Sequence, residues 1–230
     1  MAKGARVWIT RTQPGADATA ARLTALGYEP VVRPLLRVQP IPNAMSKAPD
    51  AADIACIALT SPNGVDVIAP DAGPYLGVPV YAVGDTTADA ARAAGFTRVK
   101  SASGDIHTLA RLIASDSPQG TVFAPGAEQP AGDLPALLPD RSVLRLPVYA
   151  TVETGELIPA DTDIALLHSP RASRILAQQL AISPRTLTLI AISQAAAEPF
   201  SRLSGLTIHI ADHPDEEALL RTLGNSTRGV

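Results

Sequence analysis

The 230-residue sequence has very little cysteine and few aromatic side chains. Its one cysteine, Cys56, excludes an intramolecular disulfide and a cysteine-based metal site. Cys56 lies in the apolar run 54–59, which predicts a buried thiol that packs as a small hydrophobic group. With three Phe, one Trp and four Tyr, the chain lacks the aromatic surface that stacks single-stranded bases or a large flat cofactor.

The sequence also lacks an excess of positive charge and a long hydrophobic run. It has 19 Lys and Arg against 22 Asp and Glu, so its net charge of −3 disfavours binding to nucleic acid or an anionic membrane. No segment of 18 apolar residues occurs, and four uncharged residues between Arg6 and Arg11 are too few for a signal-peptide core. We therefore expect a soluble, cytoplasmic protein.

The composition that remains is typical of a globular α/β protein, with 46% hydrophobic residues. Short β-branched runs alternate with amphipathic stretches. Strands are expected at 6–10, 30–38, 53–60, 78–83, 121–124, 142–152, 163–168, 187–192 and 206–210, and helices at 17–26, 62–68, 87–94, 105–114, 170–180, 194–203 and 215–223. This alternation predicts parallel sheets with crossover helices.

An internal repeat indicates that the chain contains two similar halves. Residues 59–64 resemble 167–172, 81–84 resemble 190–193, and 109–112 resemble 219–222, in one order and at offsets of 108 to 110. Three blocks in register predict two α/β lobes. The strand-like runs 34–38 and 145–152 could pair where the chain passes between lobes, although a simple split near residue 120 fits the pattern as well.

Two Ser-Pro pairs follow apolar strands, at Ser61-Pro62 and Ser169-Pro170. Serine at the N-cap and proline at the first helical position are a favoured helix start, which is a purely structural explanation. The same geometry also points free N–H groups and the positive end of a helix dipole at a carboxylate or phosphate. Thr87, after Gly84, and Gly104, before Asp105, lie at two further predicted strand-to-helix turns.

Several kinds of catalytic site find no support in the sequence. No phosphate-binding loop, dinucleotide fingerprint or Gly-x-Ser-x-Gly elbow occurs. His209 and His213 are four residues apart, but a strand end and Pro214 argue against a shared helical face, so no metal is predicted. Glu216 and Glu217 are expected on a solvated helix face.

Tyr149 is the candidate for acid chemistry. A phenol stays protonated at neutral pH and can donate a proton to a leaving oxygen, although a tyrosine in an extended segment more often serves packing. Its place in the run 145–152, where two lobes would meet, favours the functional interpretation.

An ordered set of short blocks extends along the chain: Val7-Trp8-Ile9-Thr10-Arg11, Leu26-Gly27-Tyr28, Pro34, 58–65, 81–88, Ser103-Gly104-Asp105, Pro125-Gly126 and Pro147-Val148-Tyr149. Taken together, these blocks resemble the uroporphyrinogen-III synthase family. The resemblance depends on the ordered set, since no single block is specific. It extends over nearly the whole chain.

The resemblance implies two parallel-sheet α/β lobes joined by a two-stranded hinge, with the active site in the cleft between them. The implied domains are a discontinuous lobe of 1–35 plus 154–230, hinge strands 36–38 and 148–153, and a second lobe of 39–147. The implied reaction is that of a lyase, in which hydroxymethylbilane loses its terminal hydroxyl and closes with inversion of ring D to uroporphyrinogen III. No cofactor or metal is implied.

The resemblance also assigns roles to individual residues. Tyr149 matches the residue proposed in the family as the acid that assists hydroxyl loss. Because the substrate is polyanionic and the chain is not basic, local donors must hold it, and those expected are Arg11, Ser61, Thr87, Gly104, Ser169 and Ser193, with Arg171 as a further candidate. The block Ile192–Ala197 departs from the family pattern because it lacks both the glycine and the threonine, which leaves Ser193 to supply that hydroxyl.

Other functions compete with this interpretation. A non-catalytic two-lobed protein that binds an anionic small molecule would use the same helix starts. A nucleotide-dependent enzyme is a weaker alternative, because no phosphate loop is present. We expect a monomer with a transient contact to the deaminase that makes the substrate.

Overall fold

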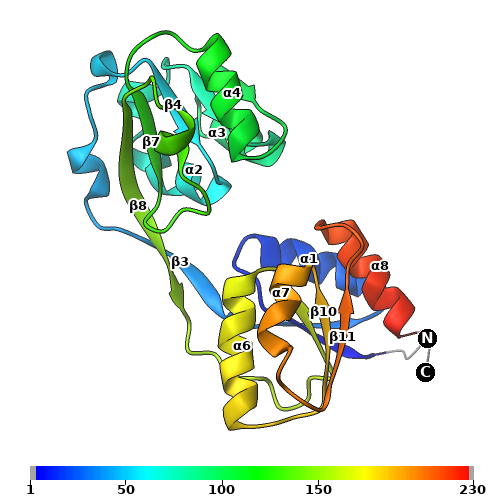
Figure 1. Cartoon of the computed structure of the whole chain (residues 1–230). Coiled ribbons are helices and arrows are strands. Elements are labelled where there is room, and N and C mark those ends of the chain that lie inside the picture. The colour runs from blue at the N-terminus through cyan, green and yellow to red at the C-terminus, as the bar shows by residue number, and fades with distance from the viewer. Residues whose placement is uncertain (1–3, 228–230) are drawn as a thin grey trace. The chain divides into compact units, whose positions relative to one another are not determined.

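The chain forms two compact units, which we describe separately in a computed structural model that describes residues 4–227. Unit 1 contains residues 1–37 and 152–230, and unit 2 contains 38–151 (Figure 1). Each unit is a mainly parallel sheet with helices on both faces. No helix within residues 4–227 is long and apolar enough to cross a membrane.

Unit 1 is built on a five-stranded parallel sheet in the order β11-β10-β9-β1-β2. Its strands are β1 (Arg6–Ile9), β2 (Glu29–Val32), β9 (Ile164–Leu167), β10 (Leu187–Ala191) and β11 (Leu206–Ile210). Its helices are α1 (Gly15–Ala25), α6 (Pro170–Ile182), α7 (Gln194–Ala197) and α8 (Glu216–Ser226). The chain runs outward from β1 on one side and from β9 on the other, so the strand order reverses between them.

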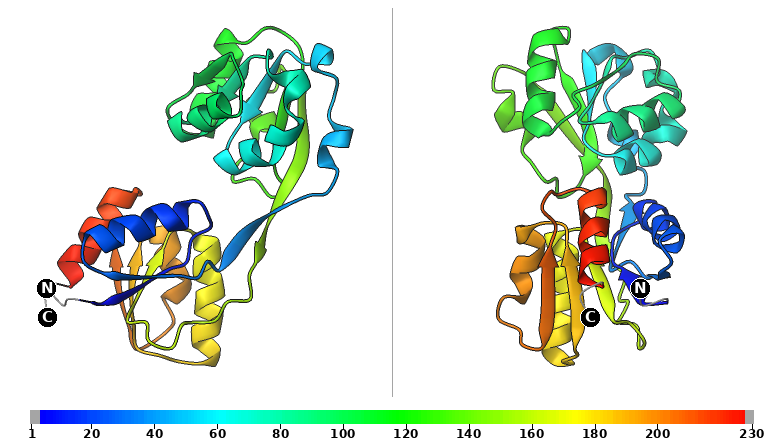
Figure 2. Two further views of the ribbon diagram at one scale, coloured as in Figure 1. Left: turned by 180° about the vertical axis from the view of Figure 1, so that it is seen from behind. Right: turned by 90° about the vertical axis from the view of Figure 1, so that its right-hand side faces the viewer.

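Alternating side chains place a hydrophobic layer on each face of this sheet. Trp8 and Leu167 pack with α6 and α7 in one core, while Val7, Ile9 and Leu166 pack with α1 and α8 in the other. Figure 2 shows these two pairs of helices on opposite faces. All five side chains have exposed fractions of 0%, so the strands are buried on both sides.

Unit 2 contains a six-stranded sheet in the order β3-β8-β7-β4-β5-β6. Its strands are β3 (Leu36–Pro40), β4 (Cys56–Leu59), β5 (Val80–Ala82), β6 (Val99–Ser101), β7 (Val122–Ala127) and β8 (Val143–Glu153). Helices α2 (Pro62–Ile68) and α3 (Asp85–Ala93) pack on one face, and α4 (Ile106–Asp116) and α5 (Leu134–Leu137) on the other. The strand order reverses between β4 and β7.

The chain passes between the units within two neighbouring strands, β3 and β8. The amide of Ile41 donates to the carbonyl of Val148 at 2.8 Å, and the amide of Thr154 donates to the carbonyl of Leu35 at 3.1 Å. These two bonds pair residues in opposite order along the chain, so β3 and β8 run antiparallel, unlike the other strand pairs.

Two expectations about secondary structure were wrong in detail, and one strand was not expected. The strand expected at 30–38 is interrupted between β2 and β3, where Pro34 has no amide hydrogen for the ladder. The helix expected at 194–203 ends at Ala197 and continues as a short 3₁₀ turn at Glu198–Phe200, because Pro199 cannot extend the helical bonding. Strand β6 was not expected, since its three residues include Lys100 and give no clear alternation.

Candidate functional site

The carboxyl ends of β4 and β7 in unit 2 border a cavity of about 470 Å³, which we call the Tyr149 cavity. Ligands of α/β sheets bind at such ends, at the point where the strand order reverses. The cavity is lined by Ala58, Thr60, Ser61, Val83, Asp105, Ile106, Ala124, Pro125, Gly126, Ala127, Gln129, Pro130, Ala131, Gly132, Leu134, Arg145, Leu146, Tyr149 and Thr151. Its volume lies within the range of small-molecule sites.

Tyr149 reaches this cavity because of an irregularity in β8. Gly126 is paired with Pro147, but the next residue of β7, Ala127, is paired with Tyr149, so β8 contains one extra residue here. Such a bulge redirects the side chains that follow it. A Cβ atom added to Gly64 would lie 3.8 Å from the Tyr149 ring, so this ring lies close to the backbone of α2.

The Tyr149 hydroxyl is free to act as a donor. The side chain is only 5% exposed, and its hydroxyl forms no hydrogen bond with any residue that the structure describes. The hydroxyls of the other three tyrosines do: Tyr28 pairs with Thr227, Tyr75 with Pro49 and Tyr81 with Asp116. The Tyr149 hydroxyl is therefore available to donate a hydrogen bond to a bound molecule.

Ser61 is at the same cavity and caps α2 as expected. Its Oγ accepts from the amide of Asn63 at 3.2 Å, and Pro62 occupies the first turn. The helix-start prediction is confirmed for this serine. Because its oxygen already accepts one bond, a ligand would meet its hydroxyl hydrogen and the neighbouring amides.

Thr87 and Gly104 are not among the residues that line the cavity, although both lie in unit 2. Thr87 is in the first turn of α3 and is 3% exposed. The amide of Gly104 donates to the carbonyl of Val83 at 3.0 Å, so this amide is already occupied. The residue after Gly104 does reach the cavity: Asp105 lines it and caps α4, accepting from the amide and the hydroxyl of Thr108 at 2.9 Å each.

The remaining predicted residues, Arg11, Ser169 and Ser193, belong to unit 1. Ser169 caps α6 by accepting from the amide of Ala172 at 3.2 Å, and Ser193 caps α7 by accepting from that of Ala196 at 3.3 Å. Both helix starts follow the carboxyl ends of their strands, β9 and β10. Within unit 1, Ser169 and Arg11 follow the two strands between which the order reverses.

Arg11 is held in a polar network that the sequence did not suggest. Its Nη1 donates to Oε2 of Glu216 at 2.8 Å, and Nε2 of His168 lies 3.0 Å from the same oxygen. Oε1 of Glu216 accepts from the hydroxyl of Thr19 at 2.6 Å. The expectation of a solvated Glu216 was wrong: its side chain is 20% exposed, whereas that of Glu217 is 75% exposed.

The electrostatics of this network follow from burial and hydrogen bonding. Burial raises the pKa of Glu216, but bonds from His168 and Thr19 and the charge of Arg11 outweigh this and lower the pKa to about 2. Burial lowers the pKa of His168 despite its bond to Glu216. His168 is therefore neutral at pH 7 and donates through Nε2, while its buried Nδ1 has no hydrogen-bond partner among the described residues.

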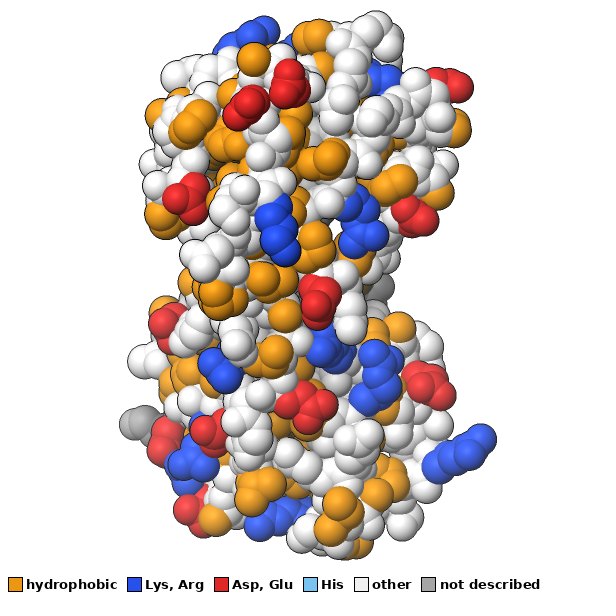
Figure 3. Space-filling view, turned by 90° about the vertical axis from the view of Figure 1, so that its left-hand side faces the viewer, with side chains coloured by type: hydrophobic (Ala, Val, Ile, Leu, Met, Phe, Trp, Pro, Cys, Tyr) orange, Lys and Arg blue, Asp and Glu red, His pale blue; other side chains and the backbone are white. Residues whose placement is uncertain are grey.

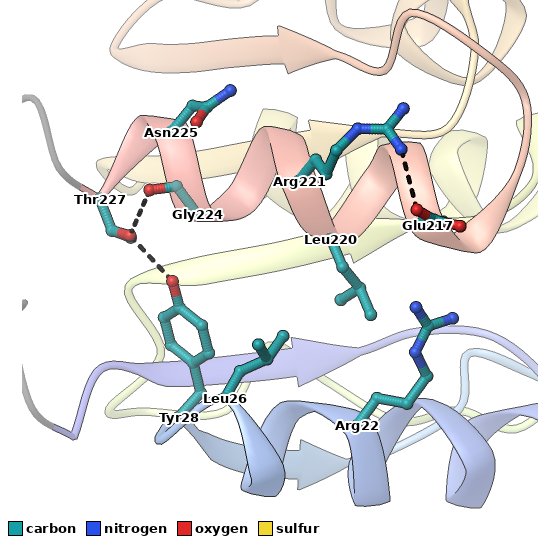
Figure 4. Close-up of a pocket in the computed structure, with 9 residues that line it drawn as sticks. All are labelled: Arg22, Leu26, Tyr28, Glu217, Leu220, Arg221, Gly224, Asn225 and Thr227. Atoms are coloured by element: carbon teal, nitrogen blue, oxygen red, sulfur yellow. Dashed lines mark hydrogen bonds and ion pairs between the residues drawn. The ribbon is translucent and has the colours of Figure 1, made fainter.

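Unit 1 has a pocket of its own, of about 370 Å³, and none of the predicted site residues line it. It lies between α1 and α8, where Figure 4 shows Leu220 pointing from α8 toward α1 and the Tyr28 hydroxyl meeting that of Thr227. The hydroxyl oxygens of Tyr28 and Thr227 are 2.8 Å apart. Within residues 4–227, no group of three or more His, Cys, Asp or Glu side chains could hold a metal ion.

The charged side chains on one face of the molecule are of both signs. Figure 3 shows Lys and Arg side chains interspersed with Asp and Glu on the face in view. This agrees with the net charge of −3, and it means that an anionic ligand would depend on individual donors.

Comparison with known proteins gives one family and several related folds. The family model described as uroporphyrinogen-III synthase HemD matches residues 17–221. The synthase of Helicobacter pylori is 18% identical with a TM-score of 0.64, over 97% of this chain and 99% of that chain. A mutant synthase of Thermus thermophilus is 18% identical with a TM-score of 0.60, over 98% of this chain and 100% of that chain. No curated protein matches significantly.

Proposed function

Because this chain belongs to the uroporphyrinogen-III synthase family, we propose that the Tyr149 cavity holds the reacting end of hydroxymethylbilane. The family reaction closes this linear tetrapyrrole with loss of water and inversion of ring D, and it requires no cofactor. The chain is thus a lyase of tetrapyrrole (haem) biosynthesis. The free hydroxyl of Tyr149 is the observation that carries the proposed assignment of the site.

Tyr149 would donate its proton to the departing hydroxyl of the substrate. The C–O bond breaks, water leaves, and the pyrrole that carried the hydroxymethyl group becomes an azafulvenium cation, while Tyr149 becomes a phenolate. Ring D then attacks through its substituted carbon to form a spiro centre. The bond from this centre to the old methylene bridge breaks, that bridge bonds to the free α-carbon of ring D, and the proton lost from this carbon restores the phenol of Tyr149. Since hydroxyl loss from such a pyrrole is easy, positioning of the flexible chain contributes much of the rate.

The rest of the substrate would be held by donors that face its carboxylates. Ser61 and the first amides of α2 are at the cavity and suit this role. Arg11, Thr87, Gly104, Ser169 and Ser193 remain predicted contacts. The hinge at 36–38 and 148–153, the monomeric state, the transient contact with the deaminase and the cytoplasmic location also remain predictions.

The test supplies the purified protein with hydroxymethylbilane made in situ by a deaminase, then oxidises and separates the type I and type III isomers. Spontaneous closure gives type I, so a type III product reports the enzyme. We expect Tyr149→Phe to lower kcat about tenfold to a hundredfold, at or below the smallest contribution usual for a general acid, while binding persists.

Tyr75→Phe is the matched control. Tyr75 is 8% exposed and lies in the same unit, but it does not line the cavity, and its hydroxyl donates to the carbonyl of Pro49 at 2.7 Å. It should keep the wild-type kcat. Unchanged turnover in Tyr149→Phe would refute the acid role. Type I product alone from the wild type would favour the non-catalytic binding protein.

A further inference from the structure

Arg145 is a cation at the Tyr149 cavity that the sequence did not single out. It is the only Lys, Arg or His among the described residues that line the cavity. It lies on β8, four residues before Tyr149, and its side chain is exposed. Since the substrate carries eight carboxylates, a cation beside the proposed acid calls for an explanation.

The guanidinium of Arg145 is not occupied within the protein. It forms no ion pair or side-chain hydrogen bond with any residue that the structure describes. Three other cations of unit 2 are engaged: Arg92 with Asp89, Lys100 with Asp116, and Arg141 with the carbonyls of Gly120 and Pro118. Arg145 thus has all its donors available to a ligand.

The surroundings of the cavity favour one carboxylate near Arg145. Ile106, Leu134 and Leu146 line the cavity and reduce its polarity, which strengthens a charge-assisted bond. The other charged lining residue, Asp105, is committed to the start of α4 through its bonds from Thr108. Its negative charge disfavours a ligand carboxylate close to α4 and so favours one close to β8.

We infer that Arg145 is a substrate-binding residue that holds one acetate or propionate carboxylate of the linear tetrapyrrole through a bidentate pair, beside Tyr149. This inference rests on the proposed function of the cavity. The planar fork of arginine matches a carboxylate in geometry and in charge. Anchoring one arm of the substrate limits the positions that its reacting end can take.

The test compares Arg145→Gln with Arg98→Gln in the deaminase-coupled assay. Arg98 is a matched control because it is exposed, belongs to the same unit, has no ion pair among the described residues and does not line the cavity. Loss of a charge-assisted bond should raise KM about tenfold to a hundredfold. At saturating substrate kcat should stay near wild type, and Arg98→Gln should leave both constants unchanged.

Two further measurements separate binding from general effects. Arg145→Lys keeps the charge without the fork and should give an intermediate KM. The KM difference between wild type and Arg145→Gln should shrink as salt is added, because screening weakens the pair. Thermal unfolding of each variant checks that the fold persists. If Arg145→Gln does not fold, Arg145→Lys becomes the test, and a KM equal to that of the wild type in Arg145→Lys overturns the inference.

An equal KM in Arg145→Gln and wild type, or an equal rise in Arg98→Gln, would also overturn it. If the wild-type enzyme makes type III product, either result contradicts only the role of Arg145 and leaves the proposed function intact. Absence of type III product from the wild type contradicts the proposed function instead.

Discussion

Glu216→Gln tests the polar network of unit 1. Glu216 accepts from Arg11 and His168 through Oε2 and from Thr19 through Oε1. Glutamine keeps the shape of the side chain but removes its charge. Its amide group also places hydrogens where a carboxylate oxygen accepted bonds, so at least one of these donors loses its partner.

The magnitude follows from the pKa of Glu216. A fall from 4.5 to about 2 on folding corresponds to about 3 kcal/mol of stability at neutral pH, at about 1.36 kcal/mol per pH unit. Two features reduce this value. His168 is neutral at pH 7 and so adds no charge to the interaction, and the Arg11 side chain is 34% exposed, so solvent screens its charge. We expect Glu216→Gln to lower the free energy of unfolding of unit 1 by about 1 to 2 kcal/mol at pH 7.

The sign of the pH dependence is fixed by the direction of the shift. The folded pKa of Glu216 is depressed, so its stabilisation is fully present above the unfolded value of 4.5 and is lost as pH falls toward about 2. The gap in stability between wild type and Glu216→Gln should therefore be constant from pH 7 to pH 5. It should narrow by about half by pH 3.

Urea unfolding followed by tryptophan fluorescence measures this effect where it occurs. Trp8 is the only tryptophan, is 0% exposed and lies in a core of unit 1. Glu217→Gln is the control, because Glu217 is the next residue of α8, is 75% exposed and forms only a surface pair with Arg221. It should cost less than about 0.5 kcal/mol. Equal losses in the two variants, or a gap of the same size at pH 7 and pH 3, would refute the reasoning.

Two further predictions concern charge at the cavity and the position of Arg11. Asp105→Asn should lower KM for hydroxymethylbilane by removing a negative charge from the Tyr149 cavity, with little change in thermal stability because asparagine caps helices as well. Asp215→Asn, at the equivalent cap of α8, should leave KM unchanged in the same assay. A Cβ on Gly15 would lie 2.6 Å from Nε of Arg11, so Gly15→Ala should push Arg11 away from Glu216. In a urea-unfolding double-mutant cycle, Gly15→Ala and Glu216→Gln should then be less than additive, and full additivity would contradict the contact.

The order of elements and the helix starts could be predicted from the sequence because they depend on local chemistry. Alternating apolar runs report burial, and a serine followed by proline supplies an N-cap whatever surrounds it. Ser61 and Ser169 cap their helices as expected. The interruption of the strand at Pro34 also depends on local chemistry, but the expectation of one strand at 30–38 missed it.

The tertiary structure decided which polar groups meet. Arg11 and Glu216 are 205 positions apart, so no spacing rule joins them, and the Glu-Glu pair of α8 gives no sign that one member is enclosed. Arg145 and Asp105 share a cavity because β8 and α4 border the same end of a sheet. Residue order thus determines elements through local periodicity and capping, whereas the charge state and the free donors of a site depend on neighbours that only the folded chain brings together.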